Sequence, residues 1–205
     1  MNEKQNREMS FGMHKLSWLD HLIYSLRVST IKKYCAQCRW KVVADVGCWY
    51  NAVFLRYIQN KYAPRKSIAY DLNLHKTELQ KVSIECIEGD LNEPLQLTEP
   101  VDCIFATAIL EHLEQPVSFL SECYKHLAPG GCLLLTTPSV WSQPVLEFLA
   151  YKLHVISEEE IRDHKEYFDK EKLLAYYEKA GFDLKNVHHE YFEIYMNNLV
   201  VAYKK

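Results

Sequence analysis

Several features that mark common protein classes are missing from this chain of 205 residues. Lysine and arginine total 24 against 27 acidic residues, and no basic block stands out, so the sequence does not indicate binding to nucleic acid. No apolar stretch approaches the roughly 20 residues that a membrane-spanning helix requires. Residues 1–10 are polar and charged, which argues against a secretory signal. These absences predict a cytoplasmic protein that neither binds nucleic acid nor spans a membrane.

Cysteine occurs in an odd number, with seven residues scattered through apparent strands and helices. That distribution is typical of reduced thiols that serve packing. Cys35 and Cys38 form a C-x-x-C pair, but neither a second pair nor suitably spaced histidines follow. A zinc site is therefore not indicated there.

The arrangement of apolar residues predicts two parts. Residues 14–34 carry apolar side chains at helical spacing, which indicates a helical cap over 1–39 on the substrate side. From 40 to 205, short β-branched or aromatic runs alternate with helical segments. Strands are expected at 42–46, 67–70, 83–87, 101–106 and 132–136. Helices are expected at 51–62, 74–81, 116–127, 143–156, 158–163 and 170–180.

This alternation predicts a doubly wound α/β fold, with a mostly parallel sheet and helices on both faces. The run Ala128-Pro129-Gly130-Gly131 is expected to end the preceding helix. The final segments 182–192 and 194–203 alternate, and so predict an antiparallel hairpin at the sheet edge.

Acidic residues follow four of the predicted strands, at Asp45, Asp71, Asp90 and Glu111. Ligands of open α/β sheets bind outside the carboxyl ends of the strands, so these acids are expected on one rim. Asp71 follows Asp45 at close to the spacing of a ribose-binding acid. Asp45 would face an ammonium group. Asp90 would accept from the amine of an adenine, with Leu91 against the ring.

The order of acid and glycine in Asp45-Val46-Gly47 separates two kinds of cofactor. A carboxylate in this place would repel a pyrophosphate but suits a cofactor that carries a cation. A nicotinamide dehydrogenase would need glycine at positions 47, 49 and 52, and only Gly47 is present. The sequence therefore disfavours a dehydrogenase.

Five motifs in order carry a resemblance to a known family: Asp45-Val46-Gly47-Cys48, Tyr70-Asp71, Gly89-Asp90-Leu91, Ile109-Leu110-Glu111-His112-Leu113 and Leu127-Ala128-Pro129-Gly130-Gly131. Over about residues 41–181 the chain resembles class I S-adenosylmethionine-dependent methyltransferases, in the small-molecule branch with "LEHL" as its fourth motif. The resemblance implies a Rossmann-like seven-stranded sheet and S-adenosylmethionine as cofactor. The cofactor contacts that it implies are Asp45, Gly47, Trp49, Asp71, Leu72, Asp90, Leu91, Ala106 and Thr107.

The glycine-rich turn departs from the family pattern, because Trp49 and Asn51 replace its second and third glycines. Asn tolerates left-handed backbone and can cap a helix, so Asn51 is a mild change. Three placements of the Trp49 side chain stay open: it blocks the pocket, it folds outward, or it lines the substrate side. A side chain that blocks the pocket would give the alternative function, a methyltransferase-like noncatalytic subunit with weakened cofactor binding.

His112 is the candidate catalytic base, because imidazole is suited to removing a proton near neutral pH. The alternative is that it orients the loop or packs. Some relatives with a Glu-x-x-Glu-His motif bind a divalent metal, but Ala108 stands at the first acid position, so we expect no metal. A residual site from Glu111, His112 and His164 is the alternative.

The stretch 139–168 is interpreted as a lid-like insertion, because it gathers aromatic residues outside the shared core. Its segment 146–156 is amphipathic enough for peripheral contact with a membrane, although it lacks a strongly basic face. The resemblance suggests a small-molecule acceptor, such as the hydroxyl of a sugar or of a lipid-linked glycan. A nucleic-acid methyltransferase is disfavoured, since no Asn-Pro-Pro-Tyr motif follows the fourth strand.

Overall fold

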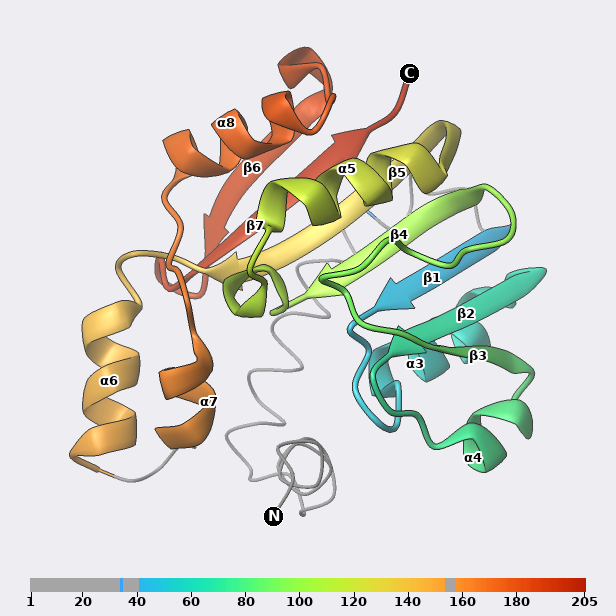
Figure 1. Cartoon of the computed structure of the whole chain (residues 1–205), viewed down its shortest axis with the longest axis horizontal. Helices are drawn as coiled ribbons and strands as arrows, with labels where there is room; N and C mark the ends of the chain where they lie inside the picture. The colour runs from blue at the N-terminus through green and yellow to red at the C-terminus, as the bar shows by residue number, and fades with distance from the viewer. Residues whose placement is uncertain (1–33, 35–40, 154–157) are drawn as a thin grey trace.

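The computed structural model of the chain describes residue 34 and the ranges 41–153 and 158–205 (Figure 1). The predicted helical cap over 1–39, apart from Tyr34, lies outside the described residues, and so does the Cys35–Cys38 pair. None of the five cysteines that the structure describes forms a disulfide, which agrees with reduced thiols.

A seven-stranded sheet forms the centre of the molecule, in the order β3-β2-β1-β4-β5-β7-β6 (Figure 1). The strands are β1 (Val42–Val46), β2 (Lys66–Asp71), β3 (Ile84–Glu88), β4 (Val101–Thr107), β5 (Leu127–Pro138), β6 (Val187–Phe192) and β7 (Asn197–Tyr203). The first five strands pair in parallel, and β7 joins β5 and β6 in antiparallel fashion. The predicted fold class, including the C-terminal hairpin, is confirmed.

Helices cover both faces of the sheet, because successive side chains of each buried strand point in opposite directions. The helices are α3 (Val53–Tyr62), α4 (Lys76–Gln80), α5 (Pro116–His126), α6 (Gln143–Tyr151), α7 (Glu158–Asp163) and α8 (Lys170–Lys179), with the 3-10 turns η1 (Leu110–His112) and η2 (Leu184–Asn186). Val42, Ala44 and Val46 of β1 belong to the cluster that includes the buried faces of α5 and α8. Val43 belongs to the cluster with α3 and α4 on the other face.

Several boundaries differ from the sequence prediction, among them the start of β7 at Asn197 rather than 194 and the end of α6 at Tyr151 rather than 156. Two of the differences have identifiable reasons. Strand β5 begins at Leu127 and runs through the Pro-Gly-Gly segment, whereas the strand was expected from 132. Gly130 accommodates this with φ of 75°, and its N–H donates to Lys204 O at 2.7 Å. Strand β6 begins at Val187 rather than 182, because Asp183 accepts from Lys185 N and caps the turn η2.

The segment 139–168 leaves the sheet and returns to it at one place, the isolated bridge between Ser139 and Phe168. Between these residues α6 and α7 project beyond the carboxyl ends of the central strands (Figure 1). Ala150 is the only residue of α6 that is buried. Among the described residues, no helix has the length and apolar character to cross a membrane. The lid role and the peripheral membrane contact stay predictions.

Candidate functional site

The turns after β1 and β2 meet at the carboxyl edge of the sheet. Because β1 and β2 are parallel neighbours, their last residues end at the same edge. The N–H of Gly47 donates to the carbonyl of Tyr70 at 2.8 Å, which holds the first turn against the end of β2. Asp45 and Asp71 are close enough that the Asp71 charge raises the pKa of Asp45.

Asp45 is a buried carboxylic acid whose environment favours the neutral form. It is 1% exposed, and burial followed by the charge of Asp71 raises its pKa to about 8. Its Oδ1 has no hydrogen-bond partner among the described residues. Buried polar atoms in folded proteins are nearly always paired. An ammonium or sulfonium ligand would complete this site, so the residues fit a cationic cofactor.

Asp71 is held by the backbone around it. Its Oδ2 accepts from the N–H of Trp49 and its Oδ1 from the N–H of Leu72, each at 2.7 Å. Burial raises its pKa, and these backbone donors oppose the rise. The backbone of Asn73 also contributes a hydrogen bond, and since a carboxylate offers about four acceptor positions, Asp71 keeps capacity to accept from a ribose hydroxyl.

Gly47 lies beneath two apolar side chains and has no room for one of its own. A Cβ at this position would lie 2.3 Å from the side chain of Ile109 and 3.3 Å from Cδ1 of Leu91. Its φ of 73° is also a conformation that favours glycine. Leu91 is therefore beside the β1 turn, and its predicted contact with the adenine ring stays a prediction. Ile109 was not among the predicted contacts. The sequence signal that could have identified it is its position directly before the Leu-Glu-His run.

The remaining predicted contacts differ in their surroundings. Asp90 is exposed, and its Oδ1 accepts from the backbone and side-chain amides of Asn92. Leu72 is 44% exposed at the rim. Ala106 is fully buried in the core, so its side chain is unavailable to a ligand, whereas Thr107 is half-buried at the end of β4. We call Asp45, Gly47, Asp71 and Leu91 the cofactor rim.

Trp49 adopts the left-handed conformation that the family supplies with glycine, with φ of 62°. This conformation costs roughly 1–2 kcal/mol for a residue with a side chain. The side chain is 42% exposed, so the indole does not occupy the protein interior.

A second group of polar residues forms where the insertion returns to the sheet. The N–H of Lys165 donates to the carbonyl of Glu111 at 2.8 Å, which brings the end of α7 against η1. His112 Nδ1 lies 3.1 Å from Asp163 Oδ2, and the rings of His112 and His164 meet edge to face at 4.9 Å. We call Glu111, His112, Asp163 and His164 the acceptor corner.

Glu111 is the buried acid of this corner. It is 1% exposed, and its Oε2 accepts from the hydroxyl of Thr137 at 2.9 Å. Burial, followed by the charge of His112, lowers the pKa of His164 to about 4, so His164 is neutral near pH 7. Ligand atoms of Glu111, His112 and His164 all lie within 4.8 Å of one another. The geometry therefore brings together the residues of the alternative cation site, and the expectation that no metal binds stays a prediction.

A family model supplies the observation that decides the class of protein. The model for the methyltransferase domain matches residues 27–187. The chain belongs to the methyltransferase-domain family. The resemblance to methyltransferases inferred from the five motifs is thereby confirmed, and the family supports S-adenosylmethionine as cofactor, whereas the small-molecule branch stays a prediction.

Curated proteins similar to this chain include a ubiquinone biosynthesis O-methyltransferase of Psychrobacter cryohalolentis, 26% identical over 137 residues. That match covers 60% of this chain and 51% of the relative. A trans-aconitate 2-methyltransferase of Azoarcus sp. is 32% identical over 106 residues, which are 50% of this chain and 41% of the relative. The chain thus spans about half the length of the curated relatives it matches.

Solved structures share the fold of this chain. An O-methyltransferase family protein from Burkholderia thailandensis superposes with a TM-score of 0.68 at 15% identity, covering 89% of this chain and 56% of the other. A SAM-dependent methyltransferase from Archaeoglobus fulgidus gives 0.66 at 17% identity, covering 92% and 100%.

Proposed function

We propose that this methyltransferase transfers a methyl group from S-adenosylmethionine to a hydroxyl oxygen of a small-molecule acceptor, with His112 as the base. When bound, the cofactor supplies a methyl group on a positively charged sulfur, which is a good leaving group. The protein then has to bind, align and deprotonate. The pairing of His112 with Asp163 beside the cofactor rim carries this proposal.

The cofactor rim has a group for each polar part of the cofactor. Asp71 would accept from the ribose hydroxyls. Asp45 would face the positive end of the cofactor, because its Oδ1 has no hydrogen-bond partner among the described residues. Leu91 and Ile109 would bound the ligand next to Gly47, where both already lie. Asp90 and Leu72 are left for the adenine end.

The side-chain contacts of His112 suit a catalytic base better than a surface histidine. If Nδ1 carries the proton and donates to Asp163, Nε2 keeps the lone pair that receives the proton of the acceptor. The neighbouring His164 is neutral near pH 7 and so adds no repulsive charge. The Glu111 carboxyl is close enough to favour the imidazolium that forms. A hydroxyl acceptor needs such a base, because it arrives protonated.

The names of the relatives support oxygen as the acceptor atom, since one is an O-methyltransferase of ubiquinone biosynthesis. The names of these relatives mention neither a sugar nor a lipid-linked glycan, which was the narrower expectation from the sequence. An acceptor panel should therefore include a phenolic hydroxyl, a sugar hydroxyl and trans-aconitate, and turnover of the sugar alone would restore the narrower expectation.

His112→Ala tests the base directly. We expect turnover of a hydroxyl acceptor to fall by about 10²- to 10⁴-fold, while the cofactor dissociation constant changes by less than about twofold. His188→Ala is the matched control, because His188 is exposed on the edge strand β6. Unchanged turnover of His112→Ala would reject the base. Turnover that a chelator removes and a divalent cation restores would replace the base with a metal at Glu111, His112 and His164.

The noncatalytic alternative depends on Trp49. Its left-handed backbone and partly exposed indole favour a side chain that folds outward over one that blocks the site. Titration calorimetry with S-adenosylmethionine separates the two functions. A dissociation constant of about micromolar supports the enzyme, and absence of binding at about millimolar cofactor supports the noncatalytic subunit.

A further inference from the structure

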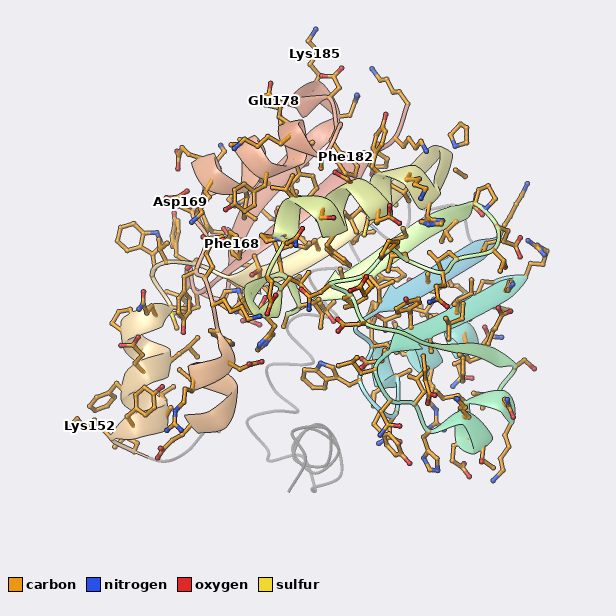
Figure 2. The ribbon with its side chains drawn as sticks, viewed as in Figure 1. Lys152, Phe168, Asp169, Glu178, Phe182 and Lys185 are labelled. Carbon is orange, nitrogen blue, oxygen red and sulfur yellow. The ribbon has the colours of Figure 1, made fainter. Side chains whose placement is uncertain are left out.

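An open cleft of about 740 Å³ lies at the base of the insertion and shares no lining residue with the cofactor rim or the acceptor corner. It is lined by Val140, Trp141, Asp169, Glu171, Tyr191 and Tyr195. Three segments far apart in the sequence therefore build it: the start of the insertion, the first turn of α8 and the β6–β7 hairpin. Figure 2 labels Asp169, where the chain enters α8, next to Phe168.

Aromatic rings form much of the wall. The rings of Tyr191 and Tyr195 are 5.3 Å apart with planes at 39°. Trp141 is 64% exposed and Tyr195 is 62% exposed, which is unusual for side chains that bury well. The lysines that lie over aromatic rings in the described part of the chain lie over other rings: Lys61, Lys172 and Lys204. No described lysine therefore lies over a ring of the cleft, although the ring of Tyr191 also meets that of His189 edge to face at 4.7 Å.

The charges around the cleft favour a cation. Asp169 and Glu171 contribute two carboxylates, and Lys170 between them contributes one ammonium. The positive end of α8 opposes a bound cation. Asp169 offsets that end, because its Oδ1 accepts from Lys172 N at 2.8 Å, and Glu171 lies in the same first turn. The Lys172 ammonium pairs with Glu166, and Asp169 also acts on it electrostatically.

The hairpin that presents Tyr195 is held in a costly conformation. Glu193, Ile194 and Tyr195 have φ values of 51°, 55° and 65°, so three consecutive residues with side chains are left-handed. Each costs roughly 1–2 kcal/mol relative to glycine. The hydroxyl of Ser139 donates to the carbonyl of Tyr195 at 2.5 Å and locks the turn to the insertion. Strain of this kind clusters at ligand clamps.

We propose that this cleft binds a quaternary ammonium group, such as the trimethylammonium of choline, between Trp141, Tyr191 and Tyr195 and against the carboxylates of Asp169 and Glu171. A methylated ammonium has a large, weakly hydrated surface that suits aromatic faces, and its positive charge suits the acidic wall. This site is independent of the methyl-transfer proposal.

The test compares two glycine substitutions in the full-length protein. Tyr195→Gly removes a cleft ring and relieves one strained residue. Ile194→Gly relieves the same strain, but Ile194 is 93% exposed and lines no part of the cleft. Both variants should unfold at the same or a higher temperature than the parent protein. Calorimetry and saturation-transfer NMR should show choline binding about tenfold weaker in Tyr195→Gly and within about twofold of the parent in Ile194→Gly.

Charge recognition is tested with the uncharged analogue of choline, in which a tert-butyl group replaces the trimethylammonium. It should bind about tenfold more weakly than choline, and Glu171→Gln should reduce the preference. Equal binding of the two, absence of saturable choline binding, or an unchanged Tyr195→Gly would overturn the proposal. Sedimentation with phosphatidylcholine vesicles identifies the source of the quaternary ammonium group. Vesicle binding that Tyr195→Gly abolishes indicates a lipid headgroup. Binding of free choline without vesicle binding indicates a soluble ligand.

Discussion

The cofactor rim and the acceptor corner are built in different ways, although both lie at the carboxyl edge of the sheet. In the rim, Asp45 and Asp71 lie at or near the carboxyl ends of the neighbouring strands β1 and β2, and hydrogen bonds between the two adjacent turns hold Gly47 and Asp71 in place. In the corner, Asp163 reaches His112 from 51 positions further along the chain. Changes in the rim should therefore affect stability and cofactor binding together, whereas changes in the corner should affect turnover with little loss of stability.

Asp45→Asn should give the largest effect in the rim. The folded pKa of Asp45 is about 8, above the value near 4 of an unfolded chain. The folded protein thus holds an additional proton between these values, so stability is highest below about pH 4 and falls as the pH rises to about 8. We expect the stability advantage of Asp45→Asn over the parent to grow by about 5 kcal/mol across this window. Urea unfolding at several pH values measures it, and a constant difference would show that Asp45 does not titrate there.

Gly47→Ala should rank second. The new methyl group meets Ile109 at 2.3 Å, and φ of 73° strains any residue with a side chain. Overpacking and backbone strain together should cost about 3 kcal/mol and abolish cofactor binding. Adding Ile109→Ala should recover the overpacking part only, as a double-mutant cycle would show. Full recovery would mean that the backbone conformation carries no cost.

Asp163→Asn tests the corner. Loss of the group that orients His112 should lower kcat with a hydroxyl acceptor by roughly 10- to 100-fold. Cofactor affinity and unfolding temperature should stay close to those of the parent. Arg162→Gln, an exposed neighbour on α7, is the control. A matching loss of cofactor affinity in Asp163→Asn would remove the distinction between the two regions.

Trp49→Gly should give the smallest effect, a gain of about 1 kcal/mol in stability, because glycine takes φ of 62° without strain. Cofactor affinity should stay equal or increase. Ala63→Gly is the control, since Ala63 has φ of 44° at the end of α3, outside the site. It should stabilise by a similar amount without changing cofactor affinity. A weaker affinity in Trp49→Gly would show that the indole contributes to binding.

The difference between the cofactor rim and the acceptor corner also explains which features could be predicted from the sequence. The run Val42–Val46 and its acid identify a strand, its end and a candidate ligand within a few residues, because burial and turn chemistry are local there. The packing of Ile109 on Gly47 depends on a side-chain contact between two strand ends, which no spacing rule indicates. The pairing of His112 with Asp163 depends on how the insertion returns at the Ser139–Phe168 bridge.

The strained hairpin was also beyond prediction, because Glu193, Ile194 and Tyr195 include no glycine that would signal left-handed backbone. The sequence therefore predicts the cofactor rim better than the acceptor corner.

The unpaired oxygen of Asp45 has a consequence for calorimetry. A neutral acid that must become a carboxylate when a cationic ligand arrives releases up to one proton into the solvent. Near pH 7 the heat of cofactor binding should then depend on the ionisation enthalpy of the buffer that takes up this proton, and should be more exothermic in Tris than in phosphate. The same experiment on Asp45→Asn should give heats that no longer follow the choice of buffer.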